Sequence, residues 1–303
     1  EARKHTLTEL INRYIDNILP TKPKARSQKQ QLEWWRDEIG HYVLADVTPA
    51  LVTEGKEKLQ SEKTRTGKPR TPATVKRYLA ALSHVFTIAV KDWNWATENP
   101  VSNVSKPEEP RGRTRFLSDD EIIDGQKVDG ERTRLLKACQ KSDNKYLYPV
   151  VVLALSTGMR QGEIMNLKWS DVDLKKGQIT LFETKNKEIR AVPIAGKALE
   201  LLKEHPRRLD TPLLFPSKVD INKPMDLRNP WEKVLKKAEI TDFRFHDLRH
   251  SAASYLAMNG ATPGEIAAVL GHKTLQMVKR YAHLSEAHTA SVVASMNARI
   301  FND

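Results

Sequence analysis

The stretch Phe245–Tyr281, FHDLRHSAASYLAMNGATPGEIAAVLGHKTLQMVKRY, decides how the second half of this chain is organised. His246 and Arg249 lie three residues apart, so they would share one face of a helix. The sequence Met258-Asn259-Gly260 predicts that this helix ends at a left-handed glycine. Thr262-Pro263-Gly264-Glu265 then predicts a second helix, with a threonine N-cap, a proline in the first turn and a capping box.

Two more turns extend this pattern towards the end of the stretch. Gly271 would end the second helix and place His272 in the following turn. Thr274 can cap a third helix, which would carry Tyr281. Three short helices with tight turns can bring two histidines, an arginine and a tyrosine together, so we expect a site of cationic and donor groups that faces an anion.

Two upstream segments carry further charged candidates. Ser156–Ile164, STGMRQGEI, predicts that Arg160 begins a helix just after a glycine stop at Gly158. Residues 177–184 and 188–194 read as a pair of strands, and the turn between them contains Lys185 and Lys187. The residues alone do not choose between these two lysines.

The order of these residues resembles the tyrosine recombinase (phage integrase) family, of the phage or genomic-island type. The matching stretches are TGMRQGEI, TKNK, HDLRHS and LGHKTLQMVKRY. Each stretch is weak on its own, but their order and spacing together are specific. With the region before them they cover most of the chain. The resemblance implies a catalytic set made up of Arg160, Lys185, His246, Arg249, His272 and Tyr281.

The family pattern assigns a role to each member of this set. The two arginines would hold the non-bridging oxygens of a phosphodiester, because a guanidinium matches phosphate in two directions. The histidines would donate to the phosphate or move the tyrosine proton. Tyr281 would be the nucleophile and Lys185 the general acid for the 5′-hydroxyl leaving group, with Lys187 as its rival. Glu163 would orient Arg160 or His246.

Structural roles compete with each of these assignments. A single arginine is more often an ion-pair partner, here of Glu163 or Asp247, and most tyrosines are packing residues. We interpret His250 as a structural or a surface residue. Although His246 and His250 have the i, i+4 spacing of a zinc site, no glutamate stands between them as in HExxH, so no metal is expected. No phosphate-binding loop is present, and a covalent phosphotyrosine conserves bond energy, so no ATP or other cofactor is expected either.

Composition points to a nucleic-acid partner. The 303 residues favour two domains, and 39% hydrophobic content is enough for ordinary cores. A net charge of +12 favours a polyanion, and the absence of any long apolar run favours DNA over a membrane. A single cysteine, Cys139, excludes an internal disulfide and fits a reducing cytoplasm. Together with the resemblance to phage integrases, this implies the cytoplasm and nucleoid of a bacterial host as the expected location.

The first hundred residues predict a helical DNA-binding domain. Helix starts are indicated at Thr6, after the basic run Lys22–Lys29, and at Thr48-Pro49 and Thr71-Pro72. By the resemblance, residues 1–100 would be a SAM-like core-binding domain. The basic residues expected to contact DNA phosphates, there and in the following linker, are Lys24, Arg26, Lys29, Lys63, Arg65, Lys68, Arg70, Lys76, Arg77, Arg111, Arg113 and Arg115.

Residues 101–117 contain prolines and no apolar period, which predicts an interdomain linker. Ser118-Asp119-Asp120-Glu121 matches a capping box and predicts a helix that opens the second domain, residues 118–303. The predicted fold is mainly α with a small β-sheet: a helical core-binding domain and a mixed α/β catalytic domain that form a C-shaped clamp around DNA. The chain begins at Glu1, so we expect a longer protein with an arm-site-binding domain ahead of it.

Residues 285–300 predict a C-terminal helix with Val293, Met296 and Ile300 on its apolar side. The helix could cap its own domain or, as in the family, dock on a neighbouring protomer. The expected partners are double-stranded DNA attachment or core sites, three further copies of the chain in a homotetramer, and accessory DNA-bending proteins. The expected activity is site-specific recombination through a 3′-phosphotyrosine. The alternatives are a type IB-like topoisomerase and a non-catalytic DNA-binding protein.

Overall fold

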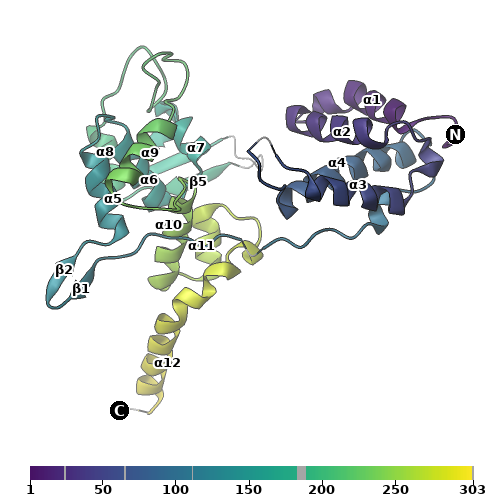
Figure 1. Ribbon diagram of the computed structural model, residues 1–303. Coiled ribbons are helices and arrows are strands. Elements are labelled where there is room, and N and C mark those ends of the chain that lie inside the picture. The colour runs from purple at the N-terminus through teal and green to yellow at the C-terminus, as the bar shows by residue number, and fades with distance from the viewer. Residues whose placement is uncertain (24, 65, 111, 183–188, 302–303) are drawn as a thin grey trace. The chain divides into compact units, whose positions relative to one another are not determined.

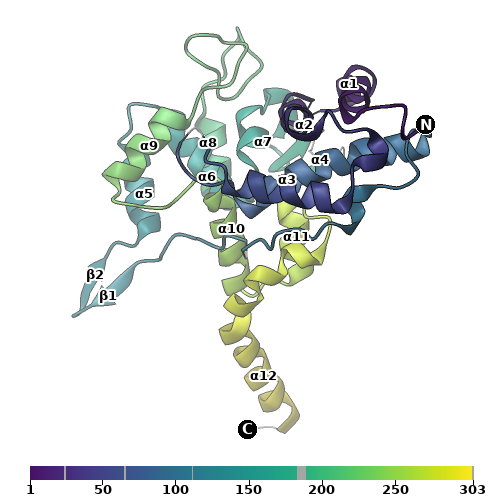
Figure 2. The ribbon, with the colours of Figure 1, turned by 45° about the vertical axis from the view of Figure 1, so that its right-hand side comes forward.

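The structure is a computed structural model that describes residues 1–303 except 24, 65, 111, 183–188 and 302–303. The chain forms two compact units, Glu1–Gly112 and Arg113–Asp303 (Figures 1 and 2). The division lies inside the segment 101–117 that the sequence marks as a linker. None of the helices in the described part is both long and apolar enough to cross a bilayer.

The N-terminal unit consists mainly of four helices, as expected: α1 Leu7–Asn17, α2 Ala25–Ile39, α3 Pro49–Ser61 and α4 Pro72–Lys91. Threonine side chains cap three of them, because Thr6, Thr48 and Thr71 each accept a hydrogen bond from a backbone N–H in the first turn. Trp35 lies fully buried between these helices, and its indole N–H donates to the carbonyl of Tyr78 at 2.9 Å.

The C-terminal unit is built around α6, a helix that is apolar on nearly all sides and largely buried. Its helices are α5 Glu131–Gln140, α6 Leu147–Thr157, α7 Gln161–Met165, α8 Gly196–Glu204, α9 Arg228–Lys237, α10 Asp247–Met258, α11 Pro263–Leu270 and α12 Glu286–Phe301. Helices α5, α7, α8 and α10 all contact α6. This central position lets α6 hold the elements that carry the candidate site.

A small antiparallel sheet has the order β3-β4-β5, with strands Val172–Asp173, Gln178–Leu181 and Arg190–Pro193. Ile179 of β4 pairs with Val192 of β5, and both side chains are buried in the core. The strand pair expected on either side of the lysine turn is therefore present. Together with the predominance of helix, it confirms the mainly α fold with a small sheet.

The prediction of a helix that begins at Ser118 is wrong. Residues Glu121–Ile123 and Gln126–Val128 form a hairpin, β1 and β2, and the next helix begins only at Glu131. Asp124 and Gly125 have φ values of 51° and 75°, which match the two central residues of a type I′ hairpin turn. The Ser118 hydroxyl instead accepts a hydrogen bond from the N–H of Glu131 at 3.1 Å, so it supports the start of α5 across the hairpin.

The three short helices expected around the site form with one correction. Helix α10 ends at Met258 before Gly260, which has φ 82°, and α11 begins with the Thr262–Glu265 capping box. The expected third helix is not α-helical, because Leu275–Met277 and Lys279–Ser285 are 3₁₀ turns. Thr274 occupies the N-cap position of the first of these turns, but its side chain makes no capping hydrogen bond.

Candidate active site

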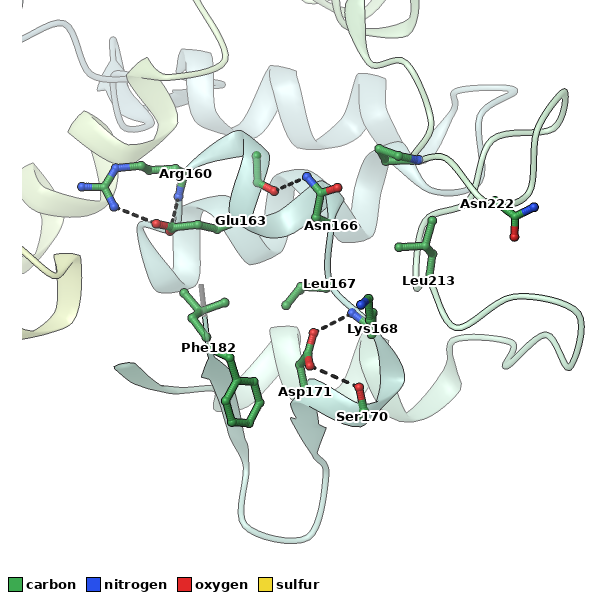
Figure 3. A pocket seen from close by; sticks show the side chains of 13 residues that line it. Arg160, Glu163, Asn166, Leu167, Lys168, Ser170, Asp171, Phe182, Leu213 and Asn222 are labelled. Atoms are coloured by element: carbon green, nitrogen blue, oxygen red, sulfur yellow. Dashed lines mark hydrogen bonds and ion pairs between the residues drawn. The ribbon is translucent and has the colours of Figure 1, made fainter. Parts of the chain in front are cut away.

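Arg160 stands where α6 turns into α7. Helix α6 ends at Gly158, whose φ of 61° is a left-handed conformation that favours glycine. A Cβ at Gly158 would lie 2.3 Å from Leu270 Cδ2, so the glycine also allows this turn to pack against α11. Arg160 binds Glu163 twice, from its backbone N–H at 2.9 Å and from its guanidinium Nη1 at 2.7 Å (Figure 3).

A cavity of about 810 Å³ opens beside Arg160 and Glu163. Its lining also includes Lys168, Asp171 and Phe182. Figure 3 shows the Arg160 guanidinium directed away from the Leu213 and Asn222 side of this cavity. Phe182 is the last described residue before the segment 183–188, so the proposed acid Lys185 and its rival Lys187 lie outside the described residues.

Arg249 lies on the first turn of α10 and is only 4% exposed. Its Nη1 donates to the carbonyl of Gly158 at 2.5 Å, and its Nη2 donates to the carbonyl of Leu270 at 2.6 Å. The guanidinium therefore joins the ends of α6 and α11, where helix carbonyls carry partial negative charge. An arginine has five N–H donors, so these two bonds leave donors for an anion.

The charge of Arg160 acts on the buried Arg249. The pKa of Arg249 is lowered to about 10, first by burial and then by the charge of Arg160, while the Glu163 carboxylate opposes the shift. Two positive charges held close together, one of them buried, favour the binding of an anion between them. The sequence-predicted arginine pair is thus brought to one region.

The two predicted histidines join this region from different elements. His246 occupies the N-cap position of α10, and His272 follows Gly271 at the end of α11. The pKa of His272 is lowered to about 4, first by burial and then by Arg249 and Arg160. Partial burial and the same two arginines lower the pKa of His246. His272 Nδ1 is buried without a hydrogen-bond partner among the described residues.

Tyr281 is 2% exposed and belongs to a buried apolar cluster that includes Ala253 of α10 and Leu270 of α11. Burial raises the pKa of its phenol, and the charges of Arg280 and Arg249 act in the opposite direction. The nucleophile candidate therefore lies within electrostatic reach of Arg249.

His250 is a residue whose position the sequence interpretation missed. Its Nδ1 forms a short hydrogen bond with the Tyr281 hydroxyl, although we expected a structural role for it. Burial lowers the pKa of His250 to about 4, so the ring is neutral near pH 7 and can accept the phenol proton in this bond. The available signal was its position one turn after His246 on the same helix.

These depressed histidine pKa values predict that the DNA-free protein loses stability in mild acid. His250 and His272 titrate near 4 in the folded chain but near 6.5 when unfolded. The unfolded chain thus binds more protons as pH falls from 6.5 to 4, and each histidine contributes a slope of up to about 1.4 kcal/mol per pH unit. In denaturant unfolding across this range, the free energy of unfolding should depend less steeply on pH for His250→Gln than for the wild-type protein. His41→Gln, at an exposed histidine, should keep the wild-type slope, and an unchanged slope in His250→Gln would contradict the assignment.

The basic candidates for DNA contact fall into four groups. Arg26, Lys29, Lys63, Lys68 and Arg77 are exposed on the N-terminal unit. Arg70 pairs with Glu62 at 2.6 Å and Lys76 pairs with Glu109 at 3.0 Å. Lys24, Arg65 and Arg111 lie outside the described residues.

The last two candidates, Arg113 and Arg115, are engaged within the C-terminal unit. Arg113 donates to Asp247 and Asp242 at 2.9 Å, and Arg115 forms an ion pair with Glu131. Both guanidinium groups therefore hold the start of the C-terminal unit in place. We do not carry them into the proposed DNA interface.

Comparison with known proteins assigns the chain to a family. Residues 129–288 match the model of the phage integrase family, the tyrosine recombinases. The chain is also 33% identical to the shufflon-specific DNA recombinase of Escherichia coli over 305 residues, covering 98% of this chain and 73% of that protein. The chain belongs to the phage integrase family. The interpretation drawn from the motif order is thereby confirmed, and this tyrosine recombinase is a member of a group of site-specific DNA recombinases.

The recombinase is also similar to two phage integrases. The integrase of Salmonella phage P22 is 30% identical over 235 residues, which cover 73% of this recombinase but only 56% of the P22 protein. In fold, the recombinase matches a λ integrase dimer bound to a COC′ core site, with a TM-score of 0.69 and 21% identity over 93% of this chain and 78% of that one. A λ integrase tetramer bound to a Holliday junction matches with a TM-score of 0.66 and 20% identity, over 89% of this chain and 78% of that one.

Proposed function

We propose that this recombinase cleaves and rejoins duplex DNA at specific sites through a covalent bond between Tyr281 and a 3′-phosphate. The observation that carries the proposal is the arrangement around Arg249. Its guanidinium joins the ends of α6 and α11, and its pKa responds to both Arg160 and Tyr281. Charge, hydrogen-bond donors and a phenol therefore surround one position where a phosphate would fit.

In this proposal the arginines stabilise the charge that develops on the phosphate. Arg160 and Arg249 come from separate helices, so they can bind two non-bridging oxygens from different directions. Their charges and those of neighbouring donors favour the phenolate as Tyr281 attacks. His246 and His272, which are neutral near pH 7 by the direction of their pKa shifts, can each donate one N–H to the phosphate.

The remaining roles concern the proton transfers. His250 holds the phenol hydroxyl in the DNA-free chain and is the nearest group that can accept its proton. Lys185 is the proposed acid that protonates the 5′-oxygen when the P–O bond breaks. The phosphotyrosine ester conserves the energy of the cleaved bond, so religation to a second strand can follow without another energy source. We place this reaction in the bacterial cytoplasm, on chromosomal or element DNA.

The N-terminal unit is proposed to hold the DNA as a core-binding domain. Its exposed basic residues on α2, on the loop before α4 and on α4 supply candidates for phosphate contacts: Arg26, Lys29, Lys63, Lys68 and Arg77. Each phosphate neutralised in this way would add about 0.9 to the slope of log affinity against log salt. We propose accessory DNA-bending proteins as additional partners.

The apolar side of α12 supports assembly of a homotetramer on DNA. Its apolar residues Val293, Met296 and Ile300 are all exposed, with Ile300 at 59%. Covering them with a second copy of the chain would be favourable, because burial of apolar surface contributes about 25 cal/mol per Å². We expect Met296→Glu/Ile300→Glu to form the covalent adduct on a single site while losing strand exchange between two sites by more than about tenfold. Native gels of the DNA complexes and a two-site recombination assay would measure this. Asn297→Glu, on the same helix, is the control, and unchanged exchange in the double variant would contradict docking through α12.

A nicked suicide substrate tests the proposed reaction. Cleavage near the nick releases a short strand that diffuses away, so the wild-type protein should become trapped on DNA as an adduct visible in denaturing gels. Peptide mapping should locate the bond at Tyr281. Relaxation of plasmids that lack a defined site would favour a topoisomerase, whereas binding without any adduct would favour a non-catalytic DNA-binding protein.

A further inference from the structure

Arg190 is a buried arginine that the motif pattern does not include. It is the first residue of β5, and its side chain is 12% exposed. Its Nη2 donates to Glu163 Oε2 at 3.2 Å, and its Nη1 donates to the carbonyl of Val269 at 3.3 Å. The side chain thus joins three elements: the strand that follows the lysine segment, the helix start that carries Arg160, and the last turn of α11.

Glu163 lies between two arginines because of this arrangement. One carboxylate oxygen, Oε1, accepts from Arg160 Nη1 at 2.7 Å. The other oxygen, Oε2, accepts from the Arg160 backbone N–H at 2.9 Å and from Arg190 at 3.2 Å. The carboxylate is nearly buried, and all of these contacts fix its orientation. Arg190 therefore limits how far Glu163, and with it the Arg160 guanidinium, can turn.

Gly271 shows how closely Arg190 approaches the turn that carries His272. A Cβ at Gly271 would lie 2.1 Å from Arg190 Nη1 and 2.8 Å from its Cδ, so no other residue fits without displacing the arginine. Gly271 has φ 65°, which adds a second reason for glycine. Arg249 binds the carbonyl of Leu270 in the same turn. Arg190 and Arg249 thus bind the consecutive carbonyls of Val269 and Leu270, just before the turn that carries His272.

Stability alone is a poor explanation for this buried arginine. Its Nε has no hydrogen-bond partner among the described residues, and an unsatisfied buried donor costs free energy. Burial and the charge of Arg160 both lower the pKa of Arg190, and the Glu163 carboxylate only partly opposes this. An apolar residue would fill the same space at lower cost. The geometry is better explained by the groups that Arg190 orients.

We infer that Arg190 is a positioning residue for DNA cleavage: it fixes Glu163, and through it Arg160, relative to the α11 turn that presents His272. The inference rests on the proposed function and extends it to a seventh side chain. It assigns Arg190 no contact with the phosphate. The side chain acts by holding two phosphate-binding groups, which come from different helices, in one geometry.

The first test compares Arg190→Ala and Arg190→Lys in the full chain on the nicked suicide substrate. We expect both to slow adduct formation at saturating DNA by about a hundredfold, because small misplacements of reacting groups cost this much, while DNA affinity changes less than about threefold. Lysine should fail to rescue because it lacks the planar fork. Arg208→Ala, at an exposed ion pair with Asp210, is the control. A wild-type rate in either Arg190 variant overturns the inference.

The second test is a double-mutant cycle of Arg190→Ala with Gly271→Ala, and the single Gly271→Ala variant serves if Arg190→Ala folds poorly. The new methyl group should displace Arg190 and slow adduct formation on its own. In Arg190→Ala/Gly271→Ala the clash is absent and only the strain of the positive φ remains. Gly271→Ala should therefore slow adduct formation much less in the Arg190→Ala background than in the wild-type protein. If the two substitutions slow adduct formation independently, so that their fold-changes multiply in the double variant, the inference is overturned. If the wild-type protein itself forms no adduct, the proposed function fails instead, which separates the two outcomes.

Discussion

Tyr281→Phe should form no covalent adduct with a nicked DNA substrate, under conditions where the wild-type protein is trapped on it. The substitution removes only the hydroxyl that would attack phosphorus. The ring should stay buried, because phenylalanine keeps the apolar surface that tyrosine contributes to the cluster with Ala253 and Leu270. A labelled oligonucleotide and a denaturing gel would measure the adduct, and a mobility-shift assay would measure DNA binding, which we expect to remain near the wild-type level.

Tyr255→Phe provides the matched control within the same helix bundle. Its hydroxyl donates to the carbonyl of Leu117 at 3.0 Å, and burial raises the pKa of this phenol to about 12. The variant loses one hydrogen bond, as Tyr281→Phe does, but it should still form the adduct. An adduct from Tyr281→Phe, or its loss only in Tyr255→Phe, would show that another residue is the nucleophile.

Local rules predicted the elements around the site because the signals there lie within one turn of the residues they govern. The Thr262–Glu265 capping box acts within the first turn of its own helix, and it forms as expected. The glycines at 158, 260 and 271 all adopt the positive φ expected at the helix ends. Such signals do not depend on the rest of the fold. This is why the ends of α6, α10 and α11, and with them Arg160 and His272, could be located from the sequence.

The same local rule failed at Ser118, where a long-range partner competed. The Ser-x-x-Glu pattern predicts a capping box, but Asp124-Gly125 forms a hairpin turn that takes Glu121 into a strand. Ser118 then finds its N–H partner at Glu131, across the hairpin. A pattern of four residues carries no information about a partner thirteen positions away.

The contacts that complete the site could not be predicted for a similar reason. His250 meets Tyr281 across 31 residues, and Arg190 reaches Glu163 across 27 residues and Val269 across 79. These pairs depend on how α10, α11 and the sheet pack on α6. Motif order predicted which residues to expect at the site, whereas the packing determines which of them contact one another.

Arg160→Gln should slow adduct formation by about a thousandfold and leave the fold nearly unchanged. Loss of a single preorganised donor to a developing oxyanion typically costs 10² to 10³ in rate, and Arg160 also carries a full charge. The stability should survive because Glu163 keeps its bonds from Arg190 and from the backbone N–H of residue 160. Single-turnover rates at saturating DNA and thermal unfolding would measure the two effects separately. Arg228→Gln, at an exposed arginine of α9, should change neither.

Arg249→Gln should differ from Arg160→Gln in stability even where the rates agree. The buried Arg249 guanidinium satisfies the carbonyls of Gly158 and Leu270, and leaving these groups without donors costs about 1 to 3 kcal/mol each. Adduct formation and the unfolding midpoint should therefore fall together in this variant. If Arg160→Gln instead destabilised the protein as much as Arg249→Gln and kept its rate, Arg160 would be an ion-pair partner of Glu163 and not a phosphate ligand. The contrast between the two variants thus separates the arginine that only binds the phosphate from the one that also holds the site together.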